Sequence, residues 1–96
     1  MKNEKDIMNE AIHVYGYENQ VNKFIEESGE CIASVMRYKI NPNIDTQSHM
    51  FEELADLGIM IEQMNIMFEQ GDIQKFRKSK IQRLEQRLKD IRYEKK

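Results

Sequence analysis

Two pairs of acidic residues with the same spacing are the features of this sequence most able to do chemistry. Glu27 and Glu30 are three positions apart, and Glu53 and Asp56 repeat that spacing later in the chain. On a helix, residues three apart project from the same side. Two such helices packed antiparallel would bring four carboxylates together at the edge of their shared core. Four acids in one place cannot all stay ionised without a cation.

The surroundings of these pairs contain few opposite charges. Glu26 adds a third carboxylate to the first pair, and residues 40–74 contain seven acidic residues but no Lys or Arg. Oxygen-only ligation suits hard cations, Mg²⁺ above all when phosphate and water complete the shell. The acids therefore predict a metal site for a phosphorylated ligand. The alternative interpretation is that they are solvated helix faces, or partners for the basic C-terminal segment.

That basic segment, residues 75–96, has ten basic and three acidic residues, although the whole chain carries a net charge of −2. Lys80, Arg83 and Arg87 fall along one helical stripe, where they can neutralise phosphate oxygens or simply balance the acidic middle segment. The stripe lacks interleaved aromatic residues, and the chain is acidic overall, so we expect no nucleic-acid polymer as a partner.

Helical periodicity and chain breakers divide the sequence into four segments. Gly16 ends the first, Asn41-Pro42-Asn43 the second and Gly71-Asp72 the third. Apolar residues recur at three- and four-residue spacing in every segment. The second helix must stop near Ile40 because Pro42 disfavours a helical residue before it, and the third is expected to begin around Asp45-Thr46.

The fold class predicted from this pattern is all-α. We expect one domain over residues 1–96, an antiparallel helical bundle with a short leading helix and three long ones, frayed at residues 93–96. Apolar residues surround almost the whole third helix. Such a helix is usually covered on more than one side, so we expect homo-oligomerisation to complete the bundle.

Composition excludes several classes of protein. The chain has 96 residues, 33% of them charged, and one cysteine, which rules out a disulfide framework. No apolar run is long enough for a membrane span, and the N-terminal residues do not look like a signal peptide. These observations predict a cytoplasmic protein without a membrane partner.

The acidic motifs and their surroundings resemble those of the MazG-like all-α nucleoside triphosphate pyrophosphohydrolases. The resemblance covers roughly residues 15–88. It rests on Glu27-x-x-Glu30, 22 intervening residues and Glu53-x-x-Asp56, within the segments 15–20, 23–30 and 52–60. Residues 80–84 are similar to a Lys-Phe-x-Arg-Arg element of the family, with Ile81 in place of Phe and Leu84 in place of the final Arg.

The resemblance implies a hydrolase that converts a (d)NTP and water to (d)NMP and pyrophosphate, dependent on Mg²⁺ with Mn²⁺ as a substitute. It places the metal ligands at Glu27, Glu30, Glu53 and Asp56, and the carboxylate that activates water at Glu26 or Glu27. Phosphate contacts would come from Lys80 and Arg83. It also implies a homodimer or homotetramer and a house-cleaning or nucleotide-pool role. The base and sugar preference stays open.

Two rival interpretations come from other classes. Glu10-x-x-His13 fits half of a di-iron bundle motif, but the second histidine, His49, has no glutamate three residues before it. The other rival is a non-enzymatic, homo-oligomeric assembly module, because Met-rich helices adapt to varied surfaces. In that module the carboxylates would only promote solubility.

Overall fold

The structure is a computed structural model that describes residues 2–68 and 71–94. Within these ranges the chain forms helices and no strand, which confirms the all-α prediction. In chain order the helices are α1 (Glu4–Tyr15), α2 (Tyr17–Ile40), α3 (Ile44–Met67) and α4 (Asp72–Glu94). The breaks between helices fall at the predicted breakers.

Local residues determine where α1 begins and ends. The backbone N–H of Asp6 donates to Asn3 Oδ1 at 2.8 Å, and the Asp6 side chain accepts from the Asn3 backbone, forming a capping box before α1. Gly16 ends that helix with φ of 92°, a left-handed region that favours glycine. Because α2 starts at the next residue, α1 folds back sharply beside it.

A short turn of Asn41-Pro42-Asn43 connects α2 to α3. The second helix ends at Ile40, as the position of Pro42 predicted. The third begins at Ile44, slightly earlier than expected from Asp45 and Thr46. The reason is a capping box in which Asn43 Oδ1 accepts from the Thr46 backbone at 2.9 Å and Thr46 Oγ1 accepts from the Asn43 backbone.

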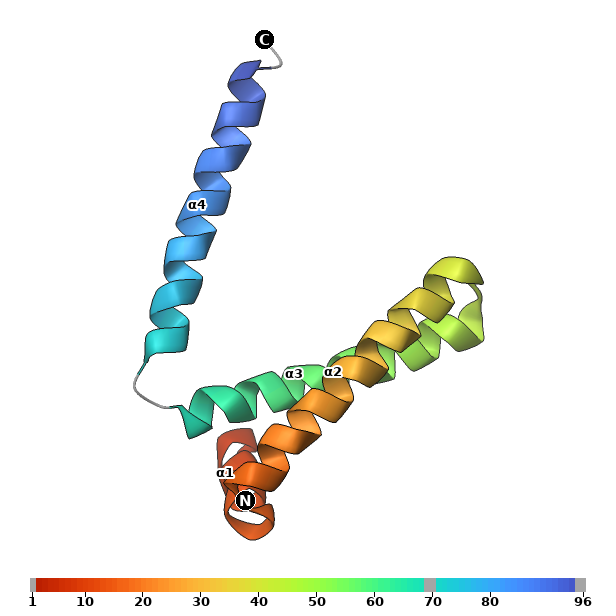
Figure 1. Cartoon of the computed structure of the whole chain (residues 1–96), viewed down its shortest axis with the longest axis vertical. Helices are drawn as coiled ribbons and strands as arrows, with labels where there is room; N and C mark the ends of the chain where they lie inside the picture. The colour runs from red at the N-terminus through yellow and green to blue at the C-terminus, as the bar shows by residue number, and fades with distance from the viewer. Residues whose placement is uncertain (1, 69–70, 95–96) are drawn as a thin grey trace.

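The long helices α2 and α3 form an antiparallel hairpin, and α1 lies across its open end (Figure 1). There the rings of Tyr17 and Phe68 meet edge to face, with centroids 5.6 Å apart. The hairpin interior is unusually polar. The described residues that are buried comprise two apolar side chains, Cys31 and Met60, and four polar ones, Gln20, Glu27, Ser34 and Gln63.

The fourth helix extends away from the other three (Figure 1). All residues from Gly71 to Tyr93 are exposed, and the molecule reaches 56 Å in its longest dimension. From its apolar seam, this helix was expected to pack in the same bundle as the others. In the single chain, α1, α2 and α3 pack together, whereas the apolar seam of α4 has no partner within the described structure.

Two further predictions concern α4 and the membrane. The helix continues to Glu94; of the terminal residues expected to fray, 95 and 96 lie outside the described residues.

No described helix combines the length and the apolar character needed to cross a lipid bilayer.

Candidate metal and phosphate site

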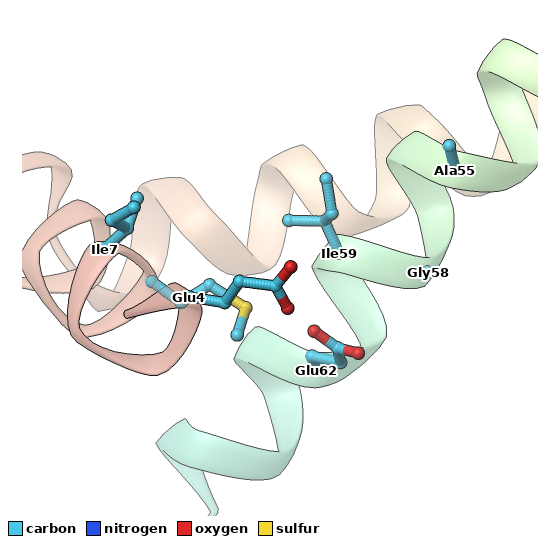
Figure 2. A pocket seen from close by; sticks show the side chains of 7 residues that line it. Glu4, Ile7, Ala55, Gly58, Ile59 and Glu62 are labelled. Carbon is cyan, nitrogen blue, oxygen red and sulfur yellow. The ribbon is translucent and has the colours of Figure 1, made fainter. Parts of the chain in front are cut away.

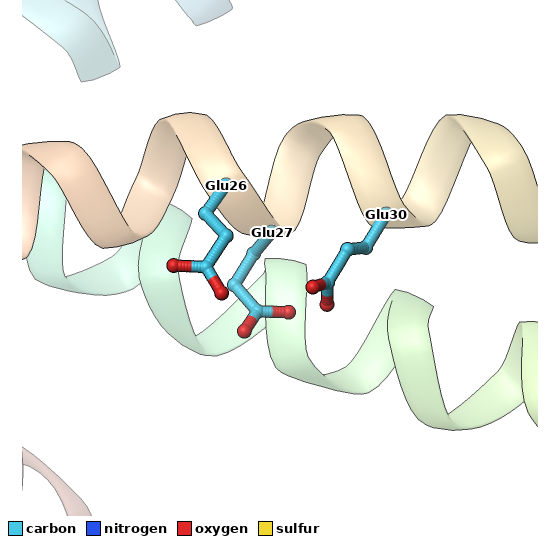
Figure 3. Close-up of side chains that lie close together, drawn as sticks. All are labelled: Glu26, Glu27 and Glu30. Atoms are coloured by element: carbon cyan, nitrogen blue, oxygen red, sulfur yellow. The ribbon is translucent and has the colours of Figure 1, made fainter.

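The hairpin brings acids of both motifs together. Carboxylate oxygens of Glu27, Glu53 and Asp56 all lie within 4.8 Å of one another, and those of Glu26, Glu27 and Glu30 form a second such group. The side chains of the second group reach from α2 toward α3 (Figure 3). Glu27 belongs to both groups, so it links the two predicted pairs into one acidic cluster.

Two oxygens of this cluster are buried without a hydrogen-bond partner. Glu27 is only 6% exposed; its Oε1 lies 3.1 Å from Lys23 Nζ, but its Oε2 has no donor among the described residues. The Glu53 side chain is 12% exposed, with Oε1 3.8 Å from His49 Nε2. Its Oε2 is likewise buried and unpartnered in the described structure. Such atoms are costly to leave unsatisfied.

The electrostatics of the cluster favour added positive charge. Burial raises the pKa of the Glu53 carboxyl above its usual 4.5, and the nearby charges of Glu30 and Glu27 raise it further, against the opposing influence of His49. The hydrogen bond to Glu27, followed by the charge of Glu26, raises the pKa of Lys23. A carboxylate whose pKa rises in this way binds a proton, or a cation in its place, more readily.

The arrangement suits a hard divalent cation. Glu27, Glu53 and Asp56 offer oxygen ligands from two helices, and the two unpartnered oxygens are available for coordination. A purely solvated acidic face would not bury Glu27. The donors are all oxygens, which favours Mg²⁺ or Mn²⁺ over metals that prefer nitrogen or sulfur.

Other predicted residues lie elsewhere. Lys80 and Arg83 are on α4, exposed and away from the hairpin, so one chain does not bring them to the acids. Glu10 pairs with the amino group of Lys2, and His13 is exposed. Neither belongs to a cluster of three metal-ligating side chains in the described structure, so the di-iron interpretation gains no support.

Several other residues of the hairpin had no predicted role. Gln20 Nε2 donates to Gln63 Oε1 at 2.5 Å, a buried amide pair between α2 and α3. Apolar periodicity gives no sign of such a pair, because both residues occupy core positions that apolar side chains usually fill. Arg37 and His49 line a hollow together with Glu30 and Glu53. In the sequence, the only sign that these four residues lie together is the helical spacing of Arg37 and His49 from the two acids.

A separate hollow of about 360 Å³ lies between α1 and α3. Ile7, Met8 and Ile59 give it an apolar lining, and Glu4 and Glu62 extend their carboxylates into the space between the helices (Figure 2). None of these acids belongs to the cluster of Glu27 and Glu53.

Searches of family models, curated proteins and solved structures found no significant match to this chain.

Proposed function

We propose that this chain is a nucleoside triphosphate pyrophosphohydrolase of the MazG-like type, using Mg²⁺, or Mn²⁺ in its place, to convert a (d)NTP to (d)NMP and pyrophosphate. The proposed metal ligands are Glu27, Glu30, Glu53 and Asp56. The proposed role is control or cleaning of nucleotide pools in the cytoplasm.

One observation carries this proposal: Glu27 Oε2 and Glu53 Oε2 are both buried and unpartnered within a cluster of carboxylates from two helices. A stable fold seldom keeps such atoms unless something else satisfies them. A divalent cation does so, and when bound it would offset the negative charge of a triphosphate.

The residues divide the chemistry between them. Glu27 lies in both acid groups and is buried, which suits a ligand. Glu26 is exposed at the edge of the cluster, which suits a base that accepts the proton of an attacking water. The water oxygen bonds to the α-phosphorus, the bond from that phosphorus to the bridging oxygen breaks, and pyrophosphate leaves with the electron pair. Positioning and charge neutralisation supply most of the rate enhancement.

The proposal includes a homodimer or homotetramer. The residues of the apolar seam of α4 are 40–66% exposed: Ile73, Phe76, Ile81, Leu84, Leu88 and Ile91. A seam of this kind is normally covered. The basic charge of α4 and the acidic charge of α3 are complementary, so a second copy would also offer Lys80 and Arg83 a route to bound phosphates.

The decisive experiment is pyrophosphate release from a panel of ordinary and damaged (d)NTPs, with and without Mg²⁺. We expect metal-dependent release that Glu27→Gln and Glu53→Gln each reduce by about 100-fold or more, since each removes a charge that holds the cation. Glu52→Gln is the matched control, because Glu52 is an exposed neighbour outside both acid groups. If no nucleotide is cleaved or bound, the proposal fails.

A second candidate function is a non-enzymatic assembly module. The one observation that favours it is the exposed apolar seam of α4. It predicts that Glu53→Gln leaves self-association intact and raises stability, with no divalent-cation binding to lose. Titration of the wild-type protein with Mn²⁺ separates the two candidates.

A further inference from the structure

A polar hollow of about 430 Å³ adjoins the acidic cluster on the hairpin. Glu30 and Glu53 line it where it meets the cluster, and Arg37 and His49 also line it. The lining of the hollow thus contains carboxylates that can bind a cation and two side chains that can bind an anion. A ligand that brings both kinds of charge, such as a metal-bound phosphate chain, matches that combination.

The spacing of charges along α2 fits an extended ligand. Arg37 follows Glu30 by seven residues, which places both on one face of the helix and about 10 Å apart along its axis. Within the described structure Arg37 has no ion-pair partner. Its guanidinium is therefore not neutralised by a carboxylate of the described structure. Lys23, by contrast, already forms an ion pair with Glu27.

Small residues keep the space between these charges open. Gly29 and Ala33 line the same hollow as Glu30, Glu53 and Arg37, and a Cβ added at Gly29 would meet no atom within 4 Å. A larger side chain at either position would extend into the space where a phosphate chain would lie.

We propose that this hollow binds the terminal phosphates of the triphosphate, with Arg37 as their principal protein ligand and His49 beside it. The inference rests on the proposed function, because the cation held by the acids brings the phosphates to the hollow. It assigns this contact to α2 of the same chain, in addition to the residues of α4. The leaving pyrophosphate then departs from the end of the hairpin where α2 ends and α3 begins.

The test compares Arg37→Gln with Lys39→Gln, an exposed residue in the same last turn of α2. Calorimetry measures two probes: Mn²⁺ alone, and inorganic tripolyphosphate in the presence of Mg²⁺. Arg37→Gln should leave Mn²⁺ affinity unchanged and weaken tripolyphosphate about 10- to 100-fold, as expected for losing hydrogen bonds between charged groups. Arg37→Lys should recover part of the loss, and Lys39→Gln should bind both probes normally.

The outcomes separate this inference from the proposed function. If wild type binds Mn²⁺ and Arg37→Gln binds tripolyphosphate as tightly as wild type, the hollow is not the phosphate site, and the metal proposal stands. If no nucleotide is hydrolysed but tripolyphosphate affinity still depends on Arg37, the hollow binds polyphosphate and the hydrolase proposal fails. If wild type binds neither probe, both proposals are overturned.

Discussion

The α2–α3 hairpin and α4 differ in which side chains they bury and which they expose. The hairpin places its charged acids against each other, with Glu27 buried and linked to Lys23. The fourth helix keeps its charges in solvent and leaves its apolar seam uncovered. Among the described residues, two buried carboxylate oxygens of the hairpin have no hydrogen-bond partner, and the apolar seam of α4 has nothing covering it. Because the described part of the chain supplies neither partner, we propose that each region binds something from outside.

The largest expected effect concerns the proposed second copy that would cover α4. Replacing Leu84 and Leu88 together with glutamine should convert an oligomer to a monomer, weakening self-association at least 100-fold, because each buried leucine contributes about 1.5–3 kcal/mol. Sedimentation velocity or light scattering measures the change. The control is a double substitution of Glu85 and Lys89 by glutamine, which removes a surface pair 3.3 Å apart outside the seam. A wild-type protein that is monomeric at high concentration would contradict this prediction.

The next effect concerns the proposed cation site of the hairpin. The pKa of Glu53 is raised above 4.5 in the folded state, so between its unfolded and folded pKa values the folded protein binds more protons than the unfolded chain. The free energy of unfolding therefore falls as pH rises through that window. Without divalent cations, Glu53→Gln should raise the Tm at pH 7 and change it little near pH 4.

Adding Mg²⁺ sharpens the same experiment. The cation replaces the proton, so it should raise the Tm of wild type at pH 7 and leave that of Glu53→Gln nearly unchanged. Thermal unfolding followed by circular dichroism at the two pH values measures both effects. Equal pH dependence in the two proteins would show that Glu53 is not the group responsible.

A smaller effect tests Lys23, the cation that the hairpin already has. Lys23→Gln removes the positive charge 3.1 Å from Glu27 Oε1, which should lower the Tm in the absence of metal. It should also tighten Mn²⁺ binding by about 2- to 5-fold, as expected for the loss of one partly exposed ion pair. Calorimetric titration with Mn²⁺ measures this. Weaker binding in the variant would mean that Lys23 supports the cation site and does not compete with it.

The sequence predicts the hairpin better than it predicts α4, and the reason is physical. Helix ends depend on local residues such as Gly16, Pro42 and Asn43, which act within one or two turns. The meeting of Glu27 with Glu53 and Asp56 follows from their spacing once two helices pack antiparallel. Periodicity also identifies the α4 seam, but it does not say what covers a seam, because that depends on residues distant in sequence or in another chain.

The smallest effect compares two glycines that differ in backbone conformation. Gly29 lies within α2, where an added Cβ meets nothing within 4 Å, so Gly29→Ala should stabilise the hairpin by about 0.5–1 kcal/mol in urea unfolding. At Gly16, whose φ is 92°, the same substitution should lower the free energy of unfolding, because alanine rarely adopts that conformation. If Gly29→Ala also weakens tripolyphosphate binding while it stabilises the fold, the glycine is retained for the space it leaves beside the acids, and the hairpin gives up stability to bind its ligand.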